Sequence, residues 1–147
     1  MSSMTLALLL QASLLAATAD SSSPQYAEAY QESAESGRPL LVLVGADWCP
    51  ACERMKSSVI PQVRQRGGLK KIAFATVNTD QHSALASKLM SGGSIPQLIL
   101  YRKTSAGWER HQLTGAQSPS SVQEFIDRGV ETTVFAKQTT PGSENHQ

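Results

Sequence analysis

Residues 40–52 have the sequence LLVLVGADWCPAC, and this stretch decides the fold class. Its first five residues are apolar without a break, which is typical of a strand buried on both faces of a sheet. After a short turn, Pro50 occupies the first turn of a helix, where a missing N–H costs no hydrogen bond. Two cysteines, Cys49 and Cys52, are therefore predicted at the start of a helix that follows a central strand.

Periodic patterns on either side predict alternating helices and strands. The expected elements are a helix over 24–36, a strand over 40–44, a helix from 50, a strand over 72–79, a helix over 83–90, two antiparallel strands over 97–102 and 108–113, and a helix from 118. Pro61 is expected to break or kink the second helix. This order predicts an α/β fold with a mixed central sheet of about four strands flanked by helices.

The first and last of these helices each carry a candidate buried face. In the first, the residues that share one side are Tyr26, Ala27, Tyr30 and Ala34. In the last, the apolar residues at helical spacing are Val122, Phe125, Ile126 and Val130. We interpret the second stripe as packing against the core.

The two ends of the chain differ from its middle. Residues 1–19 carry no charged side chain, contain an apolar stretch and end in a small-x-small cleavage pattern, Ala17-Thr18-Ala19. We expect a signal peptide over 1–19, one folded domain over 20–135 and a disordered tail over 136–147. An uncleaved membrane anchor is the alternative, although the apolar run is short against the ~20 residues that span a bilayer.

Length and charge exclude some classes of protein. A chain of 147 residues has room for one domain. Thirteen basic and twelve acidic residues give a formal net charge of +1, which provides no electrostatic basis for binding nucleic acid. We expect no nucleic-acid partner and, after cleavage of the leader, no stable membrane insertion.

The C-x-x-C spacing at a helix start is typical of a redox dithiol. Cys49 is placed beside unpaired N–H groups and the positive end of the helix dipole, which favour a thiolate over a thiol. Cys52 follows one turn later on the same side and is more shielded. Cys49 is thus the candidate nucleophile, and Cys52 the thiol that resolves the mixed disulfide.

Two other interpretations of the cysteine pair stay open. A purely structural disulfide would close a ring too small to restrain much of the unfolded chain. A zinc site is disfavoured because His82, His111 and His146 show no ligand spacing, but two thiolates could hold copper(I).

Four segments, in the right order over most of the folded domain, resemble the thioredoxin superfamily. They are the active-site segment at residues 46–52, the strand end at 77–80 (VNTD), the cis-proline loop at 94–96 (SIP) and the late glycine at Gly115. The leader and the sequence motif A-D-W-C-x-x-C-x-x-M-K most resemble those of exported thioredoxin-like proteins, including the C-terminal domain of bacterial thiol:disulfide interchange proteins.

This resemblance implies a thioredoxin-like fold in which the Ile95–Pro96 bond is cis and faces the dithiol. An extended substrate segment could then pair with the backbone of Ile95 beside Pro96. Trp48 would be an apolar contact surface next to the nucleophile, with ordinary packing as the alternative.

The implied function is that of an exported thiol:disulfide oxidoreductase. It would reduce or exchange protein disulfides without a cofactor, take electrons from a redox partner protein, and act as a monomer in the periplasm or outside a bacterial cell. The alternative is a thioredoxin-like binding or delivery module, such as a copper(I)-handling or assembly factor, whose dithiol does not turn over.

The chain departs from the family at two positions. Leu43 stands where thioredoxin itself has a buried acid that helps to deprotonate the resolving thiol, and Thr76 stands at the position of the partner lysine. Asp47 and Glu53 are the nearby candidates for proton transfer, although both could equally be solvated surface charges.

Local residues also bear on the direction of the reaction. Pro50 resembles the less reducing members of the family, whereas the acidic Asp47 and Glu53 disfavour a thiolate. We expect an intermediate or reducing couple.

Overall fold

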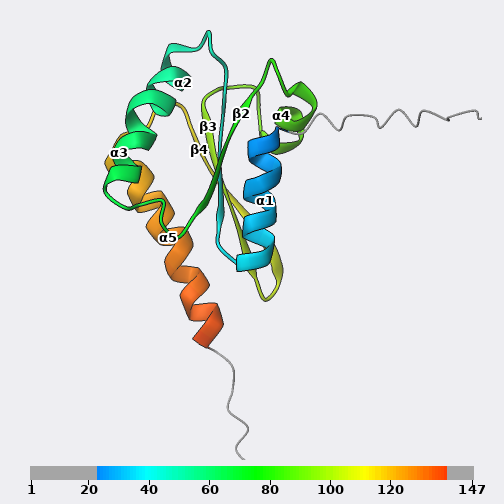
Figure 1. The fold of residues 1–147 in the computed structure, drawn as a ribbon, viewed down its shortest axis with the longest axis vertical. Coiled ribbons are helices and arrows are strands. Elements are labelled where there is room, and N and C mark those ends of the chain that lie inside the picture. Colours follow the sequence, from blue (N-terminus) through cyan, green and yellow to red (C-terminus); the bar gives the residue numbers. More distant parts are fainter. Residues whose placement is uncertain (1–22, 139–147) are drawn as a thin grey trace, which may run out of the picture.

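The sheet is built around β1 (Leu40–Gly45) in the computed structural model, which describes residues 23–138 (Figure 1). β1 pairs in parallel with β2 (Ala73–Asn78) and antiparallel with β3 (Gln97–Thr104), which pairs antiparallel with β4 (Gly107–Thr114). The strand order is β2-β1-β3-β4. The predicted mixed four-stranded sheet, with the apolar strand inside it, is confirmed.

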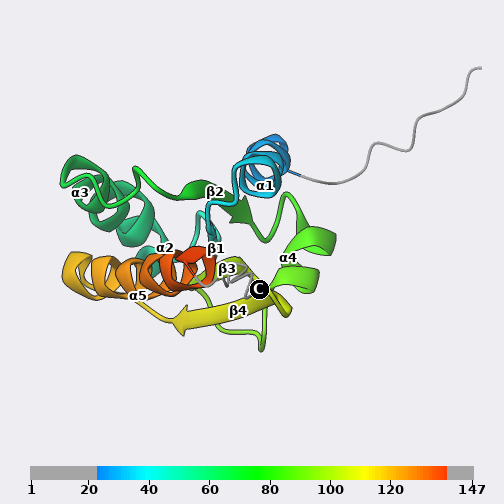
Figure 2. The same cartoon turned by 90° about the horizontal axis from the view of Figure 1, so that it is seen from below.

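Helices cover both faces of this sheet (Figure 2). One face carries α1 (Pro24–Ser36) and α4 (Ser83–Leu89), and the other carries α2 (Pro50–Arg54), α3 (Ile60–Gln65) and α5 (Pro119–Gln138). Because neighbouring residues of a strand point to opposite faces, β1 supplies both cores. Leu41 and Leu43 pack among α3 and α5, while Leu40, Val42 and Val44 pack under α1 and α4.

The bounds of α1 match the prediction, but its buried face does not. The buried residues are Ala29 and Ser33, with Tyr26 half-buried, whereas Ala27, Tyr30 and Ala34 are exposed. The small Ala29 and Ser33 let the helix lie close to the sheet, and the Ser33 hydroxyl donates a hydrogen bond to the Arg38 carbonyl at 2.6 Å. The predicted face was therefore right only at Tyr26.

Pro61 does not end the second helix. α2 continues through a π-helical turn at Met55–Val59 into α3, and the N–H of Ile60 bonds to the carbonyl of Met55. Proline has no N–H and its ring crowds the carbonyl four residues earlier, so the wider turn lets the chain stay helical. The consequence is one helical run that carries both cysteines at its beginning.

The last helix of the described chain is α5. α5 continues to Gln138, three residues beyond the predicted boundary at 135. Its predicted stripe is buried at Val122, Phe125 and Ile126, which confirms its packing role. The signal peptide over 1–19 and the rest of the tail lie outside the described residues. Within residues 23–138, no helix has the length and apolarity to cross a membrane.

Candidate active site

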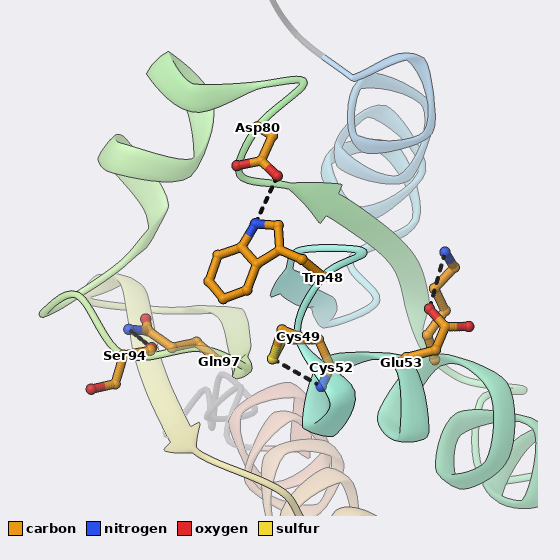
Figure 3. Close-up of a disulfide and its surroundings, with 8 residues drawn as sticks. Trp48, Cys49, Cys52, Glu53, Asp80, Ser94 and Gln97 are labelled. Atoms are coloured by element: carbon orange, nitrogen blue, oxygen red, sulfur yellow. Dashed lines mark hydrogen bonds and ion pairs between the residues drawn. A yellow bond between two sulfur atoms is a disulfide. The ribbon is translucent and has the colours of Figure 1, made fainter.

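Cys49 and Cys52 form a disulfide where β1 passes into α2 (Figure 3). Their Cα atoms are 5.2 Å apart. Cys49 is the N-cap of α2, with extended backbone angles (φ −93°, ψ 109°), and its Sγ accepts the N–H of Cys52 at 3.2 Å. Both side chains are buried, with 7% and 5% of their surfaces exposed. The pair therefore has the helix-start placement that the spacing predicts.

Gly45 makes this arrangement possible, and sequence reasoning did not single it out. A Cβ atom at Gly45 would lie 2.8 Å from the Cβ of Cys52 and 3.0 Å from its Sγ. The end of β1 therefore approaches the disulfide more closely than any side chain would allow. The available signal was a glycine that ends an otherwise aliphatic strand.

The loop before β3 completes the other side of the dithiol. The Ile95–Pro96 peptide bond is cis, and Ile95 packs against a cluster of Ala46, Cys49 and Cys52. The carbonyl of Pro96 accepts the N–H of Gly115 at 2.8 Å. The cis bond that the resemblance implied is present, and it lies beside the sulfur atoms.

Trp48 lies on the surface next to the disulfide. Its side chain is 69% exposed, and its indole N–H donates a hydrogen bond to Oδ2 of Asp80 at 2.9 Å (Figure 3). This exposure does not fit the packing alternative, and the role as a contact surface stays a prediction. Asp80 is the last residue of the VNTD segment and follows β2, but its partner 32 residues away could not be known from the sequence.

A cavity of about 480 Å³ lies beside Cys52 on the β2 side. Its lining includes both proton-transfer candidates, Asp47 and Glu53, and also Lys56. The ammonium of Lys56 lies 3.6 Å from Oδ1 of Asp47 and 3.8 Å from Oε2 of Glu53, and all three side chains are about half exposed or more. The two carboxylates thus line the cavity beside Cys52, but they are solvated, and both are paired with the Lys56 ammonium.

The positions that depart from the family line the same cavity. Leu43 and Thr76 are direct neighbours in the β1–β2 register, and the Thr76 hydroxyl donates a hydrogen bond to the side-chain carbonyl of Gln25 at 2.8 Å. Neither can take a proton from a thiol. Lys56, which sequence reasoning overlooked, forms ion pairs with both carboxylates.

Metal ligands do not gather elsewhere in the described part of the chain. Residues 23–138 contain no group of three or more His, Cys, Asp or Glu side chains placed to hold an ion. His146 lies outside these residues.

Comparisons with known proteins agree with the geometry. A family model described as thioredoxin-like matches residues 20–103. Thioredoxin 1 of Synechococcus elongatus is 30% identical over 98 residues, which are 67% of this chain and 86% of that protein. Thioredoxin C-3 of Corynebacterium nephridii is 27% identical over 96 residues, which are 65% of this chain but only 61% of that protein.

Solved structures share the architecture as well. A thioredoxin from Thermus thermophilus superposes with a TM-score of 0.63 at 18% identity, over 82% of this chain and 95% of that one. Trxlp from Edwardsiella tarda superposes with a TM-score of 0.51 at 34% identity, over 67% of this chain and 91% of that one. The fold is thioredoxin-like, and the Cys49–Cys52 pair supports a thiol–disulfide redox role. The chain belongs to the thioredoxin-like family.

Proposed function

We propose that the protein is an exported thiol:disulfide oxidoreductase that reduces or exchanges disulfides of other proteins. The observation that carries this proposal is the Cys49–Cys52 disulfide at the N-cap of α2, between the exposed Trp48 and the cis Ile95–Pro96 bond. A structural disulfide has no need of an exposed indole and a partly exposed Ile95 beside it. Both are useful to a protein that must bind another polypeptide briefly.

The reduced protein would act by two successive exchanges. The Cys49 thiolate attacks one sulfur of the substrate disulfide, whose S–S bond breaks, and the departing sulfur takes up a proton. The Cys52 thiol then loses its proton and attacks Sγ of Cys49, which releases the second substrate thiol and leaves the Cys49–Cys52 disulfide. Two electrons have passed to the substrate, and a dithiol of a redox partner protein restores them.

The position of Cys49 supports its role as the nucleophile. The N–H of Cys52 points at its sulfur, and hydrogen bonds to a thiolate favour the charged form. The positive end of α2 acts in the same direction, although α2 is short before its π turn.

Proton transfer at Cys52 would use the adjoining cavity. Leu43 and Thr76 offer no acid or base there, so Asp47 or Glu53 would accept the proton through water. The same two carboxylates disfavour extra negative charge on sulfur, which supports an intermediate or reducing couple. Export rests on the leader, and a peptide map of the mature protein should lack Met1.

Insulin reduction tests the proposal. With dithiothreitol as the electron source, the wild type should accelerate insulin precipitation, and Cys49→Ser should fall to the rate of dithiothreitol alone. Cys52→Ser is the matched control, because it keeps the nucleophile: incubated with insulin in the absence of dithiothreitol, it should accumulate a mixed disulfide through Cys49. Failure of the wild type to reduce insulin, with tight binding of copper(I) or a partner, would instead identify a binding module.

A further inference from the structure

Gln97 is a fully buried polar side chain next to the cis proline. It is the first residue of β3, follows Pro96 directly and has 0% of its surface exposed. Burial of an amide is costly unless its hydrogen bonds are made inside the protein. The partners of Gln97 therefore indicate what the residue does.

All of these partners lie in the loop that leads to Ile95. Its Nε2 donates to the carbonyls of Ser94 at 2.9 Å, Ser91 at 3.0 Å and Gly92 at 3.3 Å. Its Oε1 accepts the N–H of Ser91 at 3.2 Å. One side chain thus binds both ends of the four-residue segment 91–94, and Figure 3 shows its bond to Ser94 beside the disulfide.

The loop itself contains little that would hold its shape. Residues 91–94 (SGGS) are exposed, and Gly92 has a positive φ of 79°. A Cβ atom at Gly92 or Gly93 would meet nothing within 4 Å, so neither glycine is packed. Two adjacent glycines have high conformational entropy when they are free. An external constraint is needed to keep the next residue, Ile95, in one place.

β4 supplies a second attachment. The Gln112 amide donates to the Ser91 carbonyl at 3.4 Å, and Arg110 donates to the Leu89 carbonyl at 2.8 Å, just before the loop. Neither reaches Ser94. Among the described hydrogen bonds, Gln97 supplies the one that fixes the carbonyl directly before Ile95.

We propose that Gln97 is a positioning residue for substrate binding: its amide holds loop 91–94 so that the backbone of Ile95 is ready to pair with an extended segment of a protein substrate. This inference rests on the proposed function. In this proposal Gln97 takes no part in the exchange reactions of the sulfur atoms. It reduces the conformational entropy that the loop loses when the substrate binds. Binding of protein substrates should thus depend on Gln97, and sulfur chemistry should not.

The test compares two disulfides in Gln97→Met, a substitution of similar length that cannot make these hydrogen bonds. With insulin we expect KM to rise by roughly three- to tenfold with little change in kcat. With bis(hydroxyethyl) disulfide, which has no peptide backbone to pair, the rate should stay within about twofold of wild type. Amide hydrogen exchange should become faster at residues 91–94. Gln62→Met is the matched control, because Gln62 is exposed on α3 and its side-chain amide donates to the Ser58 hydroxyl of the preceding turn, far from loop 91–94 in the chain.

Each other outcome has a defined meaning. An unchanged KM for insulin, or a parallel loss with both substrates, would overturn the inference, since a merely structural role affects both equally. If Gln97→Met does not fold, Gly92→Ala disturbs the same loop from outside the core and should give the same split between substrates; an equal effect on both would refute the idea. Inactivity of the wild type with insulin would instead refute the proposed function.

Discussion

Gly45 shows how much one residue constrains the dithiol. Because a Cβ atom at this position would lie 2.8 Å from the Cβ of Cys52, Gly45→Ala forces either β1 or the start of α2 to move. Overpacking of this kind costs about 1–3 kcal/mol of unfolding free energy. We expect that loss in urea unfolding of Gly45→Ala, together with a changed equilibrium constant for reduction by glutathione.

Gly93→Ala provides the comparison for this prediction. Gly93 has no atom within 4 Å of the added Cβ and lies in an exposed loop, so its unfolding free energy should change by less than about 0.5 kcal/mol. Equal stability of Gly45→Ala and the wild type would mean that the contact between β1 and Cys52 is looser than the geometry indicates.

Some site residues can be predicted from local sequence motifs, and others are recognised only from their contacts in the folded chain. Cys49, Cys52 and Pro96 belong to short motifs whose chemistry is local, so the sequence predicted them. Asp80 and Gln97 act through hydrogen bonds to Trp48 and to loop 91–94, and these pairings exist only after the chain has folded. A buried polar residue in a strand has no distinctive sequence pattern, because its partners decide whether burial is tolerated.

At the scale of elements, the β3–β4 hairpin contains a pH-sensitive contact. The buried Arg102 donates from Nε to Oε2 of Glu109 at 2.8 Å, directly across the hairpin, and also from Nη2. The hydrogen bond from Arg102 lowers the pKa of Glu109, with a further lowering by the charges of Arg102 and His111, against an opposing effect of desolvation.

The sign of the stability effect follows from this direction. A carboxyl whose pKa is lower in the folded state stabilises the protein above its unfolded pKa of about 4.3, and this contribution is lost as the pH falls through the folded pKa. We expect Glu109→Gln to melt below the wild type at pH 7, and the difference in Tm to shrink in acid.

The exposed Glu124 of α5 supplies the control, and Glu124→Gln should melt close to the wild type at both pH values. If the difference in Tm between Glu109→Gln and the wild type did not depend on pH, the ion pair would not be the source of the effect.

Element positions were predictable where one local pattern dominates. The apolar run of β1 and the stripe of α5 each point to burial without information from elsewhere. The buried face of α1 was not predictable, because the buried Ser33 hydroxyl finds its partner, the Arg38 carbonyl, only in the folded chain. The π turn before Pro61 was not predictable either. A proline alone predicts the end of a helix, whereas here the helix continues and its residues stay packed in the core.

At the scale of the whole molecule, the sheet separates two cores, and the cysteine pair lies at the end of β1, which contributes to both. Reduction of the disulfide is therefore coupled to the stability of the entire domain. Folding and disulfide reduction form a closed thermodynamic cycle. Any preference of the fold for one redox form therefore appears as a difference in unfolding free energy between the oxidised and the reduced protein.

The proposed reducing direction makes this difference measurable. A couple that is more reducing than the same dithiol in the unfolded chain stabilises the disulfide form, whereas strongly oxidising enzymes stabilise the reduced form. We expect the oxidised protein to have the higher Tm, with each 30 mV of difference in potential equivalent to about 1.4 kcal/mol. Calorimetry with and without dithiothreitol measures this difference in Tm.

The control is a variant with both Cys49→Ser and Cys52→Ser, whose Tm should not change with the reductant. A higher Tm for the reduced protein would assign the opposite direction, because the fold would then stabilise the dithiol form.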